Sequence, residues 1–231
     1  DALEAAKDDD RIGAVHLELS SLTSAGIDKL ERVSEAIADF QTSGKPVIAS
    51  ADFYTQQGYF IAAHADEVYL NPEGIVFLQG YGTYRTFYKD AIDLLRIDWN
   101  VFRVGSHKSF AEPYTRMDMS PEDRESRTRL LDQLWGAYQE RVVGARGLDA
   151  AAIDDYAQNL VAHTEAAGGD MALVARDRGL VDALLSRTEL RNVMIGHVGP
   201  DDEDESTYSG VWMYEYLHQL SLRGVGQADE S

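Results

Sequence analysis

The most reactive arrangement in this sequence is a lysine that follows an apolar, β-prone run and a glycine. The run Val101–Val104 ends at Gly105, and Lys108 stands three residues later with Phe110 close behind it. Apolar neighbours take an ammonium group out of water, which lowers the pKa of a buried lysine by up to about 3–5 units. A neutral lysine amine is the general base that a Ser/Lys hydrolase needs near neutral pH. Lys108 is therefore the candidate catalytic residue.

The same stretch supplies no obvious nucleophile for that base. Ser106 and Ser109 flank Lys108, but side chains one or two positions away in an extended loop point elsewhere or compete for the same space. A hydrogen bond that orients Lys108 is the more favoured role for either serine. The sequence also lacks both Gly-x-Ser-x-Gly and Ser-x-x-Lys, the spacings of two large classes of serine hydrolase.

Other kinds of active site lack their residues as well. The chain has no cysteine, which excludes disulfides, thiolate zinc sites and a cysteine nucleophile. Its six histidines show no paired metal-ligand spacing. Gly80-Tyr81-Gly82 begins like a dinucleotide fingerprint, but Arg85 stands where the third glycine belongs. We expect neither a metal nor a cofactor.

Charge and hydropathy limit the partners. The chain has 21 Lys and Arg against 40 Asp and Glu, a net charge of −19, and such a body repels phosphate backbones, so we expect no nucleic-acid partner. No apolar run approaches the roughly 18–20 residues of a spanning helix. The chain starts at Asp1 without an initiator methionine or a signal-peptide pattern, which is typical of a piece of a longer protein.

Strands that alternate with helices of ten to fifteen residues predict an α/β fold with a largely parallel sheet and ligands at strand ends. The predicted strands lie at 15–19, 47–49, 68–70 and 76–78, with a last one ending at Gly105. The predicted helices of this half span 30–40, 57–65 and 84–95. Four aromatic residues of the third helix region are expected to pack in the core or between domains: Tyr81, Tyr84, Phe87 and Tyr88.

The second half is predicted to be a helical layer. Ser120 as N-cap and Pro121 at the first position open a long amphipathic helix that runs to about Gly144. Shorter helices are predicted at 148–160, 169–178 and 188–195. The acidic run 201–205 is expected to be a solvated loop, 211–220 either a strand or a helix, and 224–231 a linker. We divide the chain into an α/β domain, 1–197, and a terminal part, 198–231.

Several blocks of the sequence resemble a known family. The most specific block runs from Arg103 to Pro121 and includes Lys108-Ser109, Glu112-Pro113 and Asp118-Met119-Ser120-Pro121. Further matches are Gly44-Lys45-Pro46-Val47, Gln57-Gly58-Tyr59-Phe60, Asn71-Pro72-Glu73-Gly74 and Gly179-Leu180-Val181-Asp182. Together they resemble the signal peptide peptidase A family of serine proteases in the ClpP/crotonase superfamily, and in particular the amino-terminal half of its long two-domain form.

The resemblance implies a divided active site. Lys108 matches the family's catalytic lysine, whereas the nucleophilic serine of the family lies in the carboxy-terminal half, in a Ser-Gly-Gly-Tyr turn. The equivalent turn here reads Gln56-Gln57-Gly58-Tyr59, and the loop 20–26 lacks the proline and glycine pattern of the oxyanion loop. The resemblance therefore implies that the isolated chain is inactive and that its partner is the carboxy-terminal domain carrying the serine.

The family also implies a setting for this chemistry. Its members form membrane-attached homotetramers on the outer side of the bacterial inner membrane and degrade cleaved signal peptides, which are apolar and bind in an extended form. Attachment to the membrane would use a segment absent from this chain. The substrate-binding residues, the peptide specificity and the oligomeric state of the isolated piece do not follow from the sequence.

Two other interpretations remain open. This half is alternatively an inert structural and oligomerisation module, which the degenerate serine and oxyanion positions favour. An acyl-CoA enzyme on the same superfamily fold would need backbone donors for a thioester oxygen and positive charge for the CoA phosphates, and this anionic chain offers little of either. Asp182 and Glu112 are expected to be structural ion-pair partners, with no chemical role.

Overall fold

The computed structural model describes residues 2–98 and 109–222 of the chain. These residues pack into two units, one formed by Asp1–Gln79 with Arg141–Ser231 and the other by Gly80–Glu140. The boundary between the two units falls inside one continuous helix, α6, Pro121–Arg146. The first unit contains all the described strands, so it sets the frame of the fold.

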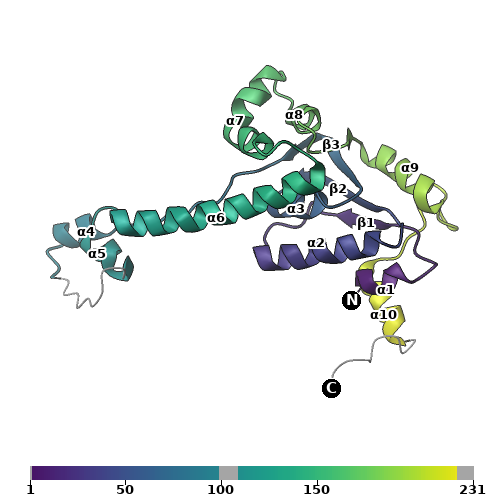
Figure 1. Ribbon diagram of the computed structural model, residues 1–231, viewed down its shortest axis with the longest axis horizontal. Helices are drawn as coiled ribbons and strands as arrows, with labels where there is room; N and C mark the ends of the chain where they lie inside the picture. The colour runs from purple at the N-terminus through teal and green to yellow at the C-terminus, as the bar shows by residue number, and fades with distance from the viewer. Residues whose placement is uncertain (1, 99–108, 223–231) are drawn as a thin grey trace. The chain divides into compact units, whose positions relative to one another are not determined.

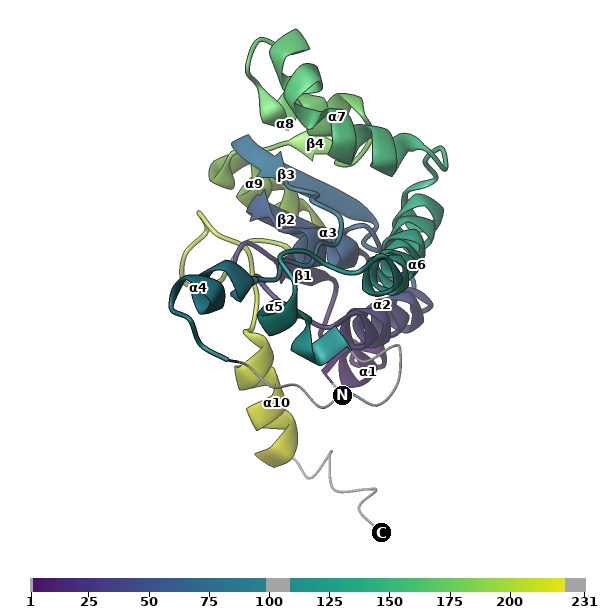
Figure 2. The same cartoon turned by 90° about the vertical axis from the view of Figure 1, so that its left-hand side faces the viewer.

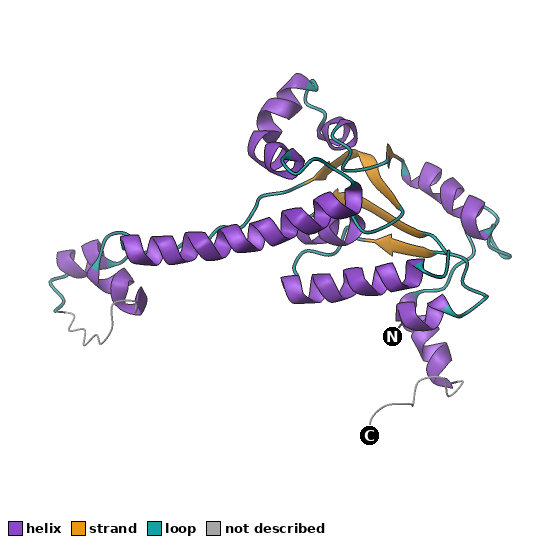
Figure 3. Ribbon diagram, viewed as in Figure 1, coloured by secondary structure: helices purple, strands orange, loops and turns teal. Residues whose placement is uncertain are grey.

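The first unit is built on a four-stranded sheet in which every neighbouring pair is parallel, in the order β1-β2-β3-β4 (Figures 1 and 3). The strands are β1 Val15–Glu18, β2 Val47–Tyr54, β3 Glu67–Val76 and β4 Ala183–Leu184. Strand β2, one of the two inner strands, is hydrophobic at its start, where Val47, Ile48 and Ala49 are fully buried. A strand enclosed on both faces reads as a continuous apolar run. The predicted α/β class with a parallel sheet is confirmed.

Helices precede, connect and follow these strands. Those of the first unit are α1 Ala2–Lys7, α2 Ile27–Gln41, α3 Gln56–Ala62, α7 Ala152–Ala166, α8 Met171–Asp177, α9 Arg187–Val198 and α10 Met213–Leu222. Leu30, Ile37 and Phe40 recur at helical spacing and form the buried side of α2, as their spacing predicts. In α9, Ser186 and Glu189 form a reciprocal capping box. The segment 211–220, which the sequence left open between strand and helix, is largely helix α10.

The prediction of separate strands at 68–70 and 76–78 was wrong. One strand, β3, contains the first range and ends at Val76, the first residue of the second range. The break lies in its pairing with β2: Ala51 pairs with Leu70, but Phe53 pairs with Ile75. Two steps along β2 thus match five along β3, which is a bulge of three extra residues. The turn residues Asn71 to Gly74 form this bulge, and the strand resumes its direction after it instead of reversing.

The second unit contains α4 Lys89–Leu94, the 3₁₀ turn η1 Ser109–Ala111, α5 Glu112–Thr115 and most of α6. The helix predicted over 84–95 is much shorter than expected, because Tyr84 to Tyr88 is a run of aromatic and β-branched residues with low helix propensity. The long helix is confirmed as α6, and the Asp123 backbone N–H donates to the Ser120 hydroxyl over 3.2 Å, as expected of an N-cap. The strand predicted to end at Gly105 lies outside the described residues.

The two ends of the first unit lie side by side. Helices α1 and α10 are in contact, as Figures 1 and 2 show, and the Tyr216 hydroxyl donates to the Asp9 carboxylate over 3.1 Å. The Lys45 ammonium donates to the carbonyl oxygens of Ala6, Lys7 and Asp9 at 2.9 to 3.0 Å. The Ala6 and Lys7 carbonyls lie in the last turn of α1 and that of Asp9 lies just after it, where a cation is favoured by the helix dipole. Lys45 thus fixes α1 to the loop that starts β2.

Candidate active site

The predicted catalytic residue, Lys108, lies outside the described residues. The structure does describe the chain directly after it, where η1 leads into α5. Phe110, which was expected to help desolvate the lysine, is 83% exposed. Its contact with Lys108 stays a prediction, because the lysine lies outside the described residues.

Glu112 is the buried polar group nearest to Lys108 along the chain. Its side chain is 2% exposed and accepts two hydrogen bonds, from the Ser120 backbone N–H at 3.1 Å and from the Ser120 hydroxyl at 2.5 Å. Among the described residues, no basic side chain lies within ion-pair distance of this carboxylate. The ion pair predicted for Glu112 is therefore not found among the described residues. Its carboxylate instead accepts hydrogen bonds from Ser120, directly before α6.

The position that matches the family's nucleophile is a strand–turn–helix junction between β2 and α3. Thr55 is the N-cap of α3 and accepts from the Gly58 backbone N–H at 3.0 Å, while its hydroxyl donates to the Leu22 carbonyl at 2.6 Å. Gln56 follows, 7% exposed, and its side-chain oxygen accepts from the Gln79 backbone N–H at 3.0 Å. An amide cannot attack a carbonyl, so Gln56 has a structural role at this junction. Thr55 was not predicted, although a threonine before a helix is an N-cap signal.

The loop 20–26, which by resemblance corresponds to the family's oxyanion loop, and Leu19 before it place carbonyl oxygens near the start of α3. A methyl group on Gly58 would lie 3.4 Å from the Leu19 carbonyl oxygen and 3.8 Å from that of Leu22. Ser20, at the start of the loop, accepts from the Asp52 backbone N–H through its hydroxyl at 3.0 Å. An oxyanion needs N–H donors aimed at it. Carbonyl oxygens at this junction present the opposite polarity.

The aromatic residues after Gly80 are not a core cluster. Tyr84 is 98% exposed and Tyr88 is 49% exposed, so neither packs in the core of the described residues, and packing of these two against another domain stays a prediction. Tyr81 meets Trp135 of α6 edge to face, with ring centroids 6.4 Å apart, and Tyr88 stacks on Tyr114 at 5.9 Å. The first pair joins the segment after Gly80 to α6, and the second joins the start of α4 to α5, both within the second unit.

A Ser–His–Tyr cluster on the sheet was missed by the sequence analysis. His16 of β1 lies 2.7 Å through Nε2 from the Ser50 hydroxyl of β2 and 2.9 Å through Nδ1 from the Tyr208 hydroxyl. Tyr208 follows the acidic run, whose ends are joined by an antiparallel bridge between Pro200 and Tyr208. No sequence spacing signals the cluster, because its members lie 34 and 192 residues apart. Ser50 is 5% exposed and lies inside a strand, which suits packing and not attack on a peptide.

His16 predicts a pH dependence of stability. Burial lowers its pKa below the ordinary value of 6.5, partly offset by the nearby Glu18 carboxylate. The unfolded chain therefore binds a proton more readily, so the stabilisation is complete above pH 6.5 and decreases as the pH falls toward the lower folded-state pKa. We expect a smaller free energy of unfolding at pH 5.5 than at pH 7.5 in urea titrations. Burial shifts the pKa of His64 in the same direction, so His16→Gln should reduce the difference without removing it.

The exposed His218 provides the control for that experiment. His218→Gln makes the same histidine-to-glutamine change at an exposed position of α10, so it measures the effect of the substitution itself on the free energy of unfolding. If the unfolding free energy of His16→Gln still differed between pH 5.5 and pH 7.5 as much as that of the wild type, the pH dependence could not be attributed to His16.

The structure also shows the positions of two other predicted features, the ion-pairing residue Asp182 and the acidic run 201–205. Asp182, at the end of Gly-Leu-Val-Asp, pairs with Arg146 of α6 at 2.7 Å and accepts from the Val68 backbone N–H of β3 at 2.7 Å, which confirms its structural ion pair. The acidic run 201–205 is mostly exposed, as expected, and Asp201 accepts from the backbone N–H groups of Glu203 and Asp204. Asp182 thus joins the end of α6 to the edge of the sheet.

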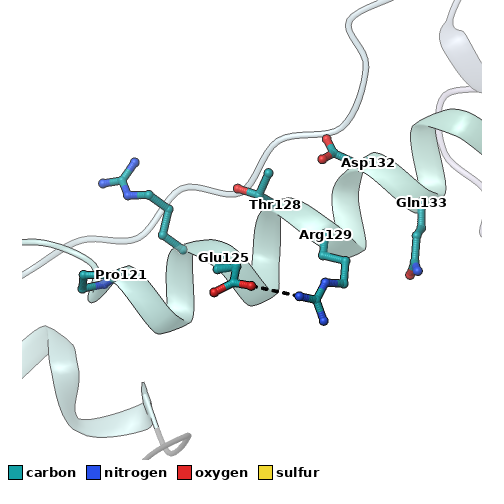
Figure 4. Close-up of a pocket in the computed structure, with 7 residues that line it drawn as sticks. Pro121, Glu125, Thr128, Arg129, Asp132 and Gln133 are labelled. Atoms are coloured by element: carbon teal, nitrogen blue, oxygen red, sulfur yellow. Dashed lines mark hydrogen bonds and ion pairs between the residues drawn. The ribbon is translucent and has the colours of Figure 1, made fainter.

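An open groove runs along α6 in the second unit, drawn in Figure 4. It is lined by residues of this helix alone: Pro121, Arg124, Glu125, Thr128, Arg129, Asp132 and Gln133. Glu125 and Arg129 form an exposed ion pair at 2.9 Å (Figure 4). A helix face of alternating charges is usually a solvated surface, and this groove contains no pair of a nucleophile and a base.

The described residues contain no group of three or more His, Asp or Glu side chains placed to hold a metal ion. Within the same residues, no helix is both long and apolar enough to span a bilayer.

Known proteins resemble most of this chain. It is 35% identical over 215 residues to Protease 4 of Salmonella typhi, which covers 93% of this chain and 35% of that protein. It is 33% identical over 222 residues to Protease 4 of Haemophilus influenzae, covering 96% of this chain and 36% of the relative. A chloroplastic serine protease SPPA of Arabidopsis thaliana is 23% identical over 209 residues, 88% of this chain and 30% of the plant protein.

This chain thus spans about a third of the length of the curated relatives it matches. The sequence pattern of Peptidase family S49 matches residues 39–197, which include both the junction at Gln56 and the block around Lys108. The family match agrees with the parallel α/β fold and with the resemblance to signal peptide peptidase A. The chain belongs to peptidase family S49.

Proposed function

We propose that this chain is the base-supplying part of a serine protease, with Lys108 as the general base for a serine on a domain outside the chain. The observation that carries the proposal is the β2–α3 junction, where a structural glutamine, Gln56, stands in the place that matches the nucleophile. The chain retains the matching lysine but not the serine, and it covers about a third of its relatives. A divided site accounts for all three facts.

The proposed reaction follows from ordinary Ser/Lys chemistry. The neutral Lys108 amine takes the proton from the serine hydroxyl as the serine oxygen attacks the scissile carbonyl carbon, and the resulting ammonium later gives that proton to the leaving amine. Water then attacks the acyl-enzyme, again with Lys108 as the base, and releases the second peptide product. We propose that the oxyanion donors also come from the serine-bearing domain, since the loop 20–26 lacks the proline and glycine pattern of the family's oxyanion loop.

The biological setting is proposed on the same basis. From the resemblance to the signal peptide peptidase A family we propose a membrane-attached homotetramer on the periplasmic side of the bacterial inner membrane, with cleaved, apolar signal peptides as substrates. The relatives named Protease 4 and SPPA support the protease activity. The membrane segment and the carboxy-terminal domain would lie outside this chain. Isolation of the full-length protein with membranes and its mass in solution test these two points separately.

The second candidate function is an inert module that positions the catalytic domain and builds the oligomer. Gln56 favours this function as well, because it fills the nucleophile position with an amide side chain, whose oxygen accepts from the Gln79 backbone N–H. The two functions differ in their need for Lys108. They make the same prediction for the isolated chain and opposite predictions for a lysine variant of the full-length protein.

The isolated chain tests the divided site. We expect residues 1–231 to fold, to hydrolyse no fluorogenic peptide above the buffer rate and to remain unlabelled by a fluorophosphonate, because its buried Ser50 and capping Thr55 are both held in structural hydrogen bonds. The full-length protein should hydrolyse the peptide and be labelled. Robust hydrolysis by the isolated chain, abolished by the fluorophosphonate, would overturn the division.

A further inference from the structure

The net charge of the chain is divided very unevenly between its two units. Residues 80–140, which form the second unit, carry nine Lys and Arg against ten Asp and Glu, a net charge of −1. The other −18 of the chain's −19 therefore lies on the first unit. Bodies that carry a large charge of one sign repel each other. Close contact with another acidic protein is therefore least costly at the second unit.

The second unit also has little hydrophobic core of its own. Among its described residues the buried ones are Glu112, Pro113, Ser120 and Tyr138, and two of these four are polar. Helix α4 contains no buried residue. A unit of this size has marginal stability even when it does bury a core. Such a unit gains stability when a partner covers its apolar side chains.

Large apolar side chains are exposed on neighbouring elements of this unit. Five of them, on α4, on η1 and on the residues beside α4 and α5, are 67% to 98% exposed: Tyr84, Leu94, Leu95, Phe110 and Met117. Helix α4 contacts α5, and α5 contacts η1. The Tyr88 N–H, at the start of α4, donates to the Pro113 carbonyl of α5 at 2.6 Å, and Figures 1 and 2 show the two helices next to each other. We call the five exposed side chains the α4–α5 surface.

We propose that the α4–α5 surface binds the same surface of a second copy of this chain. The inference rests on the homo-oligomer of the proposed function and names the surface that builds it, and the division of the active site does not enter it. Most soluble oligomers are closed and symmetric, so a patch on one copy meets the same patch on the next. Permanent interfaces of this kind are more apolar than the rest of the protein surface, as these five side chains are. Two copies that met through their first units would instead bring two charges of −18 together.

Sedimentation velocity of residues 1–231 and of the full-length protein tests this contact. We expect residues 1–231 to form a dimer or a larger oligomer, because the contact needs this chain alone. Leu94→Asp and Phe110→Asp should each weaken the association by at least about tenfold, since each buries an unpaired carboxylate in the interface. Val161→Asp is the matched control: it adds the same charge at an exposed apolar position of α7, in the first unit, and should leave the association constant unchanged.

Two measurements on the wild-type chain do not depend on a variant that folds. On dilution of the oligomer, amide hydrogen exchange in α4 and α5 should become at least about tenfold faster, while exchange in α2 stays the same. Raising NaCl from about 0.05 M to about 0.5 M should strengthen the association or leave it unchanged, because salt screens the repulsion between the acidic first units. Exchange that ignores dilution, or dissociation of the oligomer by salt, would overturn the inference.

Other partners for this surface give different results. If residues 1–231 stay monomeric at the highest concentration reached, a second copy does not cover the surface and the inference is wrong. Flotation of that monomer with phosphatidylcholine vesicles would then identify a bilayer as the partner. Trp212→Asp examines the competing exposed aromatic residue directly before α10. Dissociation by this variant but not by Leu94→Asp would also overturn the inference.

The inference and the proposed base fail in different ways. If Leu94→Asp and Phe110→Asp dissociate the full-length protein but Lys108→Ala keeps its peptidase activity, the contact stands and the base assignment is wrong. If Lys108→Ala is inactive but both aspartate variants associate as tightly as the wild type, the contact is wrong and the base assignment stands.

Discussion

Replacement of Lys108 by either arginine or alanine is expected to abolish peptide hydrolysis by the full-length protein. A general base contributes about a hundredfold to ten-thousandfold to a rate, and a serine hydroxyl without its base is a poor nucleophile. Arginine keeps the positive charge and much of the size, but its guanidinium does not lose its proton at physiological pH. Equal loss in both variants would therefore identify proton transfer, and not charge, as the function of Lys108.

The measurement is kcat and KM for a fluorogenic apolar peptide, with the melting temperature of each variant as a check on folding. Lys89 provides a matched control, since it lies in α4 of the same unit and pairs with Asp93 on the surface. Lys89→Ala should retain the wild-type kcat. A Lys108→Ala protein that keeps its peptidase rate would leave this chain the role of an inert module.

Gly74→Ala is expected to be the most destabilising methyl addition in the sheet. A methyl group on Gly74 would lie 2.5 Å from the Asp52 carbonyl oxygen and 2.9 Å from that of Asn71, both closer than real contacts allow. These are backbone atoms at the β2–β3 bulge, so relief requires the bulge itself to move. Overpacking of a buried site costs about 1–3 kcal/mol and more where the backbone must shift, and we expect about 3 kcal/mol here.

Gly136 offers the opposite case in the same chain. It lies inside α6, and a methyl group there meets nothing within 4 Å. Alanine in a helix is more favourable than glycine by about 0.8–1.0 kcal/mol, so Gly136→Ala should raise the free energy of unfolding. Urea titrations of the two variants measure both changes. A Gly74→Ala protein as stable as the wild type would contradict the tight approach at the bulge.

Local patterns in the sequence predicted the order of the elements well. Val47 to Ala49 is apolar without alternation and is a buried central strand, while Ser120-Pro121 is a helix start and is used as one. These features depend on neighbours along the chain, which a sequence displays directly. The motif ending in Asp182 was also recognised, although its contact with Arg146 appears only in the fold.

The errors arise where distant contacts decide. The turn residues Asn71 to Gly74 predict a break between two strands, but pairing with β2 continues beyond them and converts the turn into a bulge. The aromatic side chain of Tyr84 suggests burial, yet it is 98% exposed and none of the described residues covers it. Such outcomes depend on which strand or helix lies opposite, which local sequence does not encode.

The sequence singled out individual residues of the candidate site, but it did not show which residues they contact. The sequence pointed to Lys108 and to Gln56 through their resemblance to family motifs, and it assigned Glu112 an ion pair. The structure instead joins Glu112 to Ser120, eight residues later, through the start of α6. The His16 cluster carried no signal, because a lone histidine in a strand has no partner until the sheet forms.

The most direct test is to label the full-length protein with a fluorophosphonate and to identify the modified serine by mass spectrometry, with and without Lys108. The divided site predicts one modified serine, located outside residues 1–231, whose labelling is lost in Lys108→Ala. A modified serine within residues 1–231, or labelling that proceeds at the wild-type rate without Lys108, would contradict it.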